Sequence, residues 1–403
     1  MIQLATKQYL CFLVLGFSTF ITYFCIMAST NYWQYYYSST FMTYASFMYC
    51  ISEIFGTSIL MIIQKRVGSR FFIYNHYIVC LIAFISIILM NQIKDQKTKY
   101  IITLIPVFFC GFTAAQFSST IIACSTRIGP NITQATQIGI GVCGILIQLL
   151  KNGVSVFIVE DSNSPNLEKS LYLNMLMYFG LTFVIVLLCF IPWRWVEKNT
   201  SCVSNPNVNK QQEQQSSLVV SIETQQSKPK NSVSQVFKKI SLPTIFLALS
   251  NAITYLIYPA FVIKLHLYSN SSQNWWNLGV LTCHTFFDFV GRILPRFLCK
   301  QQKMTLVNSI CLLRLAFIPL FYFMTNYESE NGIYTQKPSI SNPIVYILIE
   351  AVFSFTQCFA LTAGYMKYQE KLNAEEKAVG AVVISLATNI GLGIGAGISL
   401  FFA

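Results

Sequence analysis

The sequence is poor in charged residues. Of its 403 residues, 10% are Asp, Glu, Lys or Arg, whereas 54% are hydrophobic. A soluble domain usually carries about 25% charged residues, so this composition argues against a water-soluble protein. It favours a chain whose helices have lipid as their solvent, because each crossing of the hydrocarbon needs roughly 20 apolar residues.

Signatures of catalysis and of metal binding are also missing. The chain has no P-loop, no HExxH and no GxSxG motif, and its 13 cysteines form no CxxC or Cys/His spacing. We therefore expect no enzyme, no metal site and no cofactor. The apolar residues do not alternate in ten-residue segments either, which argues against a transmembrane β-barrel.

What the sequence does contain is a series of long apolar runs. They predict eleven membrane-spanning helices, and thus an all-α polytopic membrane protein. The first run lacks a small-residue cleavage site, so we expect it to be retained as a helix. The predicted spans are 9–29, 41–63, 71–91, 101–124, 136–158, 172–192, 241–263, 277–298, 305–325, 342–366 and 376–402.

The loops between these runs indicate the orientation. Most of the 27 Lys and Arg residues fall in alternate loops. The positive-inside rule then places the N-terminus in the cytoplasm and, after eleven spans, the C-terminus outside. The net charge of +12 reflects this bias and attraction to anionic lipid, and predicts no nucleic-acid partner. The plasma membrane is favoured over an internal membrane, and Asn270 begins a glycosylation sequon in an outside loop.

A polar segment at 193–240 divides the spans into six and five. It is rich in Gln, Ser and Lys and cannot bury enough apolar area to fold alone. We predict an N-terminal six-helix bundle at 1–192, a flexible cytoplasmic linker at 193–240 and a C-terminal five-helix bundle at 241–403. Two bundles around a central path are typical of secondary transporters.

One pair of charges interrupts the eighth predicted span. In FFDFVGR, Asp288 and Arg292 are four residues apart, so they share one helical face about 6 Å apart. Such a pair at bilayer depth costs more than two leucines would. Two interpretations stay open: the pair braces neighbouring helices, or it lines a transport path and serves substrate binding or gating.

The residues around this pair carry a family resemblance. FFDFVGRILPRF resembles the eighth-helix signature of the equilibrative nucleoside transporter family, an F-x-x-x-D-x-x-G-R pattern. Other stretches resemble further helices of that family in the same order, so the resemblance covers most of the chain apart from the linker and the outer loops. These stretches are LGFSTFITYFCIMASTNYW (15–33), FTAAQFSS (112–119), TQIGIGVCG (136–144), ITYLIYPAF (253–261), FTQCFALTAGYMKY (355–368) and EEKAVGAVVISLATNIGLGIGAGISLFF (375–402).

The resemblance implies a six-plus-five arrangement like the major facilitator fold. It also implies a carrier that moves nucleosides or nucleobases by alternating access, as facilitated diffusion. The abundance of Ile, Asn, Lys and Tyr is common in AT-rich genomes such as those of protozoa, which favours purine salvage. A carrier for a sugar, drug or cation, a proton-coupled nucleoside symporter and, less favoured, a receptor or scaffold remain alternatives. We expect lipid around the helices and no obligate protein partner.

The resemblance also implies candidate substrate residues. A nucleoside needs an apolar or aromatic slot with a few fixed donors and acceptors. Gln116 can pair with the edge of a base, although an interhelical hydrogen bond is the alternative. Asp288 and Arg292 can bond to the ribose or a ring nitrogen, and Tyr23 can stack on the base.

Three further polar residues are weaker candidates. Gln357 and Asn251 are amides on predicted spans. Glu53 is a carboxyl at bilayer depth, where burial favours the protonated form, and we hypothesise that it couples transport to protons. Two positions depart from the family pattern: Tyr23 replaces a usual tryptophan, and Gln357 with Cys358 replaces a frequent Asn-Gly. Both departures bear on substrate preference.

Overall fold

The structure is a computed structural model of the whole chain. It describes residues 2–38, 40–64, 66–158, 167–199, 233–258, 260–262, 265, 273–298, 304–325, 329–330, 333–334 and 339–402. The sequon at Asn270, Pro259 of the predicted seventh helix, and residues 200–232 of the predicted linker lie outside these ranges.

The described part of the chain is almost entirely helical. The first half, residues 2–199, contains α1 (Ile2–Thr19), α2 (Ile21–Ala28), α3 (Thr30–Tyr36), α4 (Phe41–Ile63), α5 (Ser69–Met90), α6 (Gln96–Ile128), α7 (Pro130–Phe157) and α8 (Leu167–Asn199). The second half, residues 233–402, contains α10 (Val233–Ile257), α11 (Gln273–Ile293), α12 (Pro295–Leu298), α13 (Met304–Leu313), η3 (Arg314–Ala316), α14 (Phe317–Thr325), α15 (Pro343–Lys367), η4 (Tyr368–Lys371), α16 (Ala374–Ser399) and η5 (Leu400–Phe402). Two-residue strands β1 (Ser329–Glu330) and β2 (Ile333–Tyr334) pair antiparallel.

The long helices are suited to a membrane. Within the described residues, 9 helices are long and apolar enough to cross it, and the pair α1 and α2, bent by 46°, raises the number to 10. Large apolar side chains point outward at their surfaces, such as Ile62 at 74% and Leu313 at 72% exposed. Because lipid-facing helices bury their backbone polar groups internally and expose apolar side chains, the chain is a multi-pass membrane protein.

Two predicted spans are not single straight helices. The first bends where α1 meets α2, next to Phe20, and the short α3 follows before α4. The span predicted at 305–325 consists of α13, η3 and α14 in sequence. The predicted eighth span corresponds to α11, whose polar and charged residues keep it out of the apolar set.

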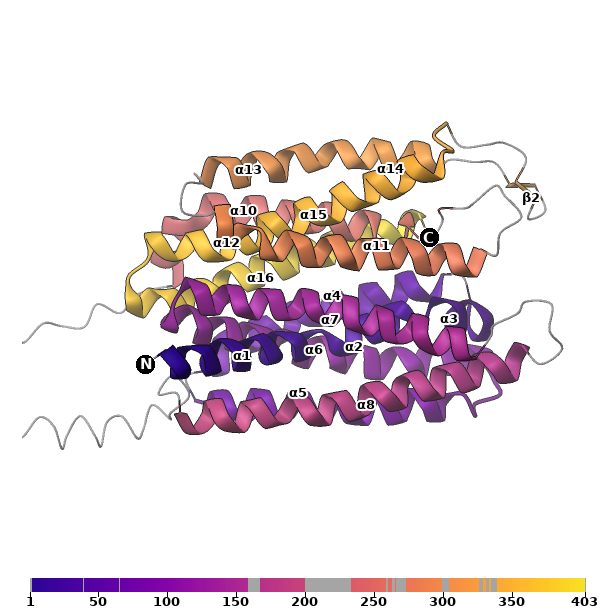
Figure 1. The fold of residues 1–403 in the computed structure, drawn as a ribbon, viewed down its shortest axis with the longest axis horizontal. Coiled ribbons are helices and arrows are strands. Elements are labelled where there is room, and N and C mark those ends of the chain that lie inside the picture. Colours follow the sequence, from indigo (N-terminus) through magenta and orange to yellow (C-terminus); the bar gives the residue numbers. More distant parts are fainter. Residues whose placement is uncertain are drawn as a thin grey trace, which may run out of the picture.

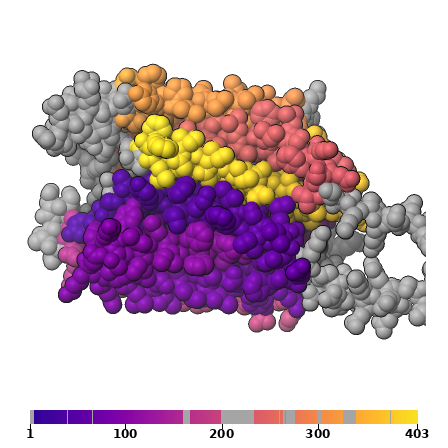
Figure 2. Space-filling model, turned by 180° about the vertical axis from the view of Figure 1, so that it is seen from behind, coloured from indigo at the N-terminus to yellow at the C-terminus, as the bar shows by residue number. Residues whose placement is uncertain are grey.

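The two halves lie side by side. Figure 1 shows the helices of the first half, in indigo to magenta, as one layer and those of the second half, in orange to yellow, as another, all roughly along one axis. The two ends of the chain, marked N and C, lie toward opposite ends of this bundle (Figure 1). Seen from behind, α16 in yellow runs along the boundary between the layers (Figure 2). Contact between the halves is made mainly by α7 with α11 and by α16 with α4 and α6.

Inside each half, helix pairs approach until their backbones touch. In the first half α1 packs on α7, and in the second half α10 packs on α16. A Cβ added to Gly139 of α7 would lie 1.9 Å from the carbonyl oxygen of Leu13, and one added to Gly391 of α16 would lie 2.1 Å from that of Ala248. Glycine at these positions lets the helices approach closely, as is common in membrane bundles.

Candidate functional site

A cavity lies between the two halves. Side chains from α4, α6 and α7 line it on one side, together with Phe20, Tyr23 and Phe24 near the bend between α1 and α2. Side chains from α10, α11, α15 and α16 line the other. The space between the side chains is about 1040 Å³, counting the part that opens to solvent.

The charged pair of α11 faces this cavity. Arg292 Nε donates to Asp288 Oδ2 over 2.8 Å, and Arg292 Nη2 donates to Asp288 Oδ1 over 3.2 Å. Both residues are less than a tenth exposed. The predicted one-turn spacing therefore produces a two-pronged ion pair, the geometry in which arginine binds a carboxylate most strongly.

Residues from other helices complete the pair. Arg292 Nη1 donates to Gln137 Oε1 of α7 over 2.7 Å, which links the two halves. The thiol of Cys358, on α15, donates to Asp288 Oδ1. Gly141 of α7 makes room, because a Cβ there would lie 2.9 Å from Arg292 Cδ. The pair thus bonds to neighbouring helices, as a brace would, and also lines the cavity.

A second acid–base pair lies one turn earlier on α11. His284 Nδ1 and Glu350 Oε1 of α15 are 2.5 Å apart, and Glu350 is fully buried. The His284 ring stacks on Tyr258, with ring centroids 4.6 Å apart and planes at 15°. His284 and Tyr258 line the cavity. The sequence shows His284 on the same stripe as Asp288, but not its partner 66 residues away.

The predicted amides of the second half lie together on the cavity wall. Gln357 donates through Nε2 to Asn251 Oδ1, and Ser250 Oγ donates to Gln357 Oε1 over 2.6 Å. Asn251 and Gln357 both line the cavity. This arrangement leaves Asn251 Nδ2 as a donor that neither of these bonds uses.

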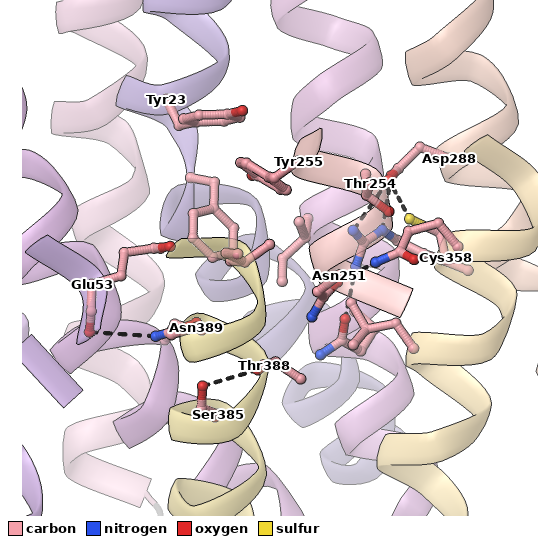
Figure 3. A pocket seen from close by; sticks show the side chains of 18 of the residues that line it. Tyr23, Glu53, Asn251, Thr254, Tyr255, Asp288, Cys358, Ser385, Thr388 and Asn389 are labelled. Carbon is pink, nitrogen blue, oxygen red and sulfur yellow. Dashed lines mark hydrogen bonds and ion pairs between the residues drawn. The ribbon is translucent and has the colours of Figure 1, made fainter. Parts of the chain in front are cut away.

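Tyr23 and Glu53 line the cavity from the first half. Tyr23 lies 6.1 Å from Tyr255 of α10, centroid to centroid, so the two rings meet across the halves. Figure 3 shows Glu53 and Asn389 on one side of the pocket and Asp288 with Cys358 on the other. Asn389 Nδ2 lies 3.5 Å from the backbone oxygen of Glu53 and donates to Thr57 Oγ1 over 2.9 Å.

Gln116 differs from the other candidates. It is buried on α6 at 3% exposure, but it is not among the residues that line the cavity, whereas its neighbours Ala115, Ser118 and Ser119 are. The sequence analysis also missed Asn389, although it lies within the stretch 375–402 that carries the resemblance. A polar side chain within an apolar run was the available signal for it.

Comparison with known proteins decides the family. The profile described as nucleoside transporter matches residues 104–403, which is most of the chain. The chain belongs to the nucleoside transporter family. The match includes α7, α11, α15 and α16, and with them both members of the Asp288–Arg292 pair and Glu350.

Two curated members of the nucleoside transporter family align with it over part of their length. The chain is 24% identical to equilibrative nucleotide transporter 8 of Arabidopsis thaliana over 57% of this chain and 53% of that protein. It is 26% identical to equilibrative nucleoside transporter 2 of Rattus norvegicus over 46% of this chain and 41% of that protein. The chain therefore matches about half the length of these curated relatives, or less.

The fold of this chain is also similar to that of a solved transporter structure. The major facilitator superfamily proton:xylose symporter XylE aligns over 97% of this chain and 86% of its own, with a TM-score of 0.59 and 11% identity. At that identity the likeness concerns the fold alone. The predicted major-facilitator-like fold is confirmed at this level.

Proposed function

We propose that this chain is a membrane carrier that moves nucleosides or nucleobases by alternating access, as facilitated diffusion. The observation that carries the proposal is the cavity between the two halves. It combines aromatic side chains with an ion pair and several amides, in a member of the nucleoside transporter family. An apolar slot with a few fixed polar groups is what binding of a flat base and a hydroxylated sugar needs.

The topology that we propose has eleven spans. α11, the eighth span along the chain, raises the number from ten to eleven. It packs along α7 and α15 inside the bundle, and its polar face turns to the cavity rather than to lipid. The spans then divide into the predicted bundles at 1–192 and 241–403 around the predicted cytoplasmic linker at 193–240, whose two ends are corrected by the structure because 193–199 continue α8 and 233–240 begin α10. An odd number of spans agrees with the ends marked N and C lying toward opposite ends of the molecule (Figure 1). The N-terminus is cytoplasmic, the C-terminus outside and the plasma membrane the location.

Substrate contacts are assigned to the cavity residues. Tyr23 bounds the slot for the base, while Asn251 and Gln357 supply amide groups. Asp288 and Arg292 serve as substrate contacts, as a gate or as both. Gln116 stays a predicted base contact, which requires its side chain to reach the cavity in another conformation of the carrier.

Alternating access needs contacts between the halves that can break. Arg292 with Gln137 is one, and Gln369 Nε2 with Thr133 Oγ1, at 3.0 Å, is another. Both lie near the start of α7, on the side that the positive-inside rule assigns to the cytoplasm. In this proposal, opening of the cavity to the cytoplasm breaks these hydrogen bonds while the helix pairs inside each half stay packed.

Proton-coupled symport is a second candidate function. It is favoured by the burial of Glu53, which is 1% exposed and lines the cavity. Uptake by wild type and Glu53→Gln across a range of external pH tests it, since loss of the pH dependence is expected only if Glu53 carries the proton. Carriers of sugars, drugs or cations and a non-transporting receptor remain further alternatives.

Uptake of radiolabelled adenosine and hypoxanthine tests the main proposal. Cells expressing wild type are expected to show saturable uptake of one or both, and Asp288→Ala, at matched surface level, is expected to lose it. That loss follows because the variant leaves Arg292 buried without its carboxylate. Absence of uptake by wild type at the cell surface would overturn the substrate assignment. Full uptake by Asp288→Ala would make the pair a structural brace.

A further inference from the structure

Protein partners take up most of the hydrogen-bonding capacity of the ion pair on α11. Arg292 directs Nε and Nη2 at Asp288 and Nη1 at Gln137, while Asp288 also accepts from the thiol of Cys358. A ligand that bonded to Arg292 would have only the second N–H of each Nη atom to use. Other polar groups in the cavity are left open by the protein.

Three such groups lie on the opposite wall. Glu53 Oε1, the hydroxyl of Tyr23 and Oγ of Ser119 have no hydrogen-bond partner among the described residues. All three residues line the cavity and are at most 6% exposed. Buried polar atoms in proteins are nearly always bonded to protein, water or ligand. Three open atoms from three helices on one wall indicate a place where a ligand supplies the missing partners.

The packing of α4 fixes the position of Glu53, which carries the carboxyl among these three open groups. A Cβ on Gly56 of α4 would lie 2.2 Å from the carbonyl oxygen of Phe112, and a Cβ on Gly111 of α6 would lie 2.5 Å from that of Tyr49. These two contacts lie on either side of Glu53 along α4. The backbone that carries Glu53 is thus held against α6, and Figure 3 shows its side chain reaching toward the pocket.

The surroundings of Glu53 suit a flat ring. Phe20, Tyr23 and Phe24 line the cavity on the side of the first half, and Tyr255 of α10 faces Tyr23 from the second half. Amides and hydroxyls such as Asn251 and Ser354 line the wall made by α10 and α15. Tyr23 is also in contact with Tyr49, at 4.9 Å between centroids. A base placed against Tyr23 would direct its polar edge toward Glu53 and leave its sugar on the side of Asn251.

We propose that Glu53 is a direct substrate ligand whose carboxyl oxygen accepts a hydrogen bond from an amino N–H on the edge of a purine base, with Tyr23 and Ser119 beside it. This inference rests on the proposed function and deepens it, because it names the class of substrate edge that the first half recognises. A site built to bond an N–H group discriminates strongly against an analogue that lacks it.

Uptake of three nucleosides tests the assignment. Adenosine carries a 6-amino group, purine riboside lacks only that group, and 3′-deoxyadenosine lacks only a ribose hydroxyl. Wild type is expected to prefer adenosine over purine riboside by about tenfold or more, since tenfold corresponds to one buried hydrogen bond. In Glu53→Met and Glu53→Ala that preference is expected to fall toward one, while the preference over 3′-deoxyadenosine stays as in wild type.

Two comparisons sharpen the experiment. Glu53→Gln keeps an accepting oxygen and should retain part of the preference. Glu350→Gln changes a buried carboxyl that does not line the cavity, and should leave the preference unchanged. The test needs only one of the two variants Glu53→Met and Glu53→Ala to reach the cell surface.

The outcomes separate this assignment from the function beneath it. Uptake without preference for adenosine over purine riboside in wild type overturns the assignment and leaves the carrier function standing. The same holds if Glu53→Met keeps the full preference, or if the preference over 3′-deoxyadenosine collapses instead, which would place the sugar at Glu53. No uptake of any nucleoside by surface-expressed wild type overturns both.

Discussion

Contacts inside the halves differ in kind from contacts between them. Gly391 and Gly393 lie two residues apart on α16, yet a Cβ on Gly391 would meet the backbone of α10 at Ala248, whereas one on Gly393 would meet the end of the Ile54 side chain of α4. Backbone cannot yield, but a side chain can change rotamer. At these two positions the contact inside a half is therefore fixed by backbone, whereas the contact between the halves can rearrange.

Polar contacts between the halves are hydrogen bonds without an ion pair among the described residues named here. Gln369 bonds to Thr133 and Asn152 to Thr282 at 2.9 Å, and the charged Arg292 bonds to Gln137 at 2.7 Å. Inside the second half, Glu350 bonds to His284 and Arg314 to Thr254. A neutral hydrogen bond contributes only about 0.5–1.5 kcal/mol net, so the neutral contacts between the halves cost little to break.

The largest effect is expected from a methyl group inside a half. Gly391→Ala would place Cβ 2.1 Å from the carbonyl oxygen of Ala248 and should destabilise the fold by about 3 kcal/mol or more, since overpacking a well-packed contact typically costs 1–3. The melting temperature of the purified protein in detergent measures it. Gly153→Ala, where nothing lies within 4 Å of the added Cβ, is the matched control. Equal melting temperatures for the two variants would contradict the comparison.

A smaller effect on stability is expected from a contact between the halves. Gln137→Leu removes the 2.7 Å hydrogen bond to Arg292, and bonds to charged groups contribute about 1.5–3 kcal/mol. We expect faster hydrogen exchange at the start of α7 and the end of α11, and an altered uptake rate, with a modest fall in melting temperature. If hydrogen exchange were unchanged and the melting temperature fell as far as it does for Gly391→Ala, the contact between Gln137 and Arg292 would be as rigid as the contacts inside a half.

The smallest effect is expected from Gly393→Ala. Its Cβ would lie 2.6 Å from Cδ1 of Ile54, and the end of that flexible side chain can move away. The cost should stay below about 1 kcal/mol, so the melting temperature should lie near that of wild type while uptake persists. If Gly393→Ala failed to fold, the contact between the halves would be as rigid as the contact inside a half.

Much of the architecture could be predicted from composition and from spacing along the chain. The apolar runs indicated the helices, because a helix in lipid must be long and apolar. The four-residue spacing of Asp288 and Arg292 predicted their pairing, because the helical repeat places such residues on one face. The bend between α1 and α2 was not visible in an unbroken apolar run.

The site was only partly predictable. Tyr23, Asn251, Gln357 and the charged pair line the cavity, whereas Gln116 does not in this conformation, and their contacts with substrate stay a prediction. No spacing along the chain could indicate that Asn389 bonds to Thr57, because 332 residues separate them.

The sequence by itself determined that this protein is a bundle of membrane helices and which residues share a face of each helix, because both follow from local composition and the helical repeat. Only the tertiary structure decided which faces meet. That depends on how close each helix pair can approach, and here glycines opposite backbone carbonyls fix the approach. Those contacts bring Glu53 to one side of the cavity and place Asp288 on the other (Figure 3).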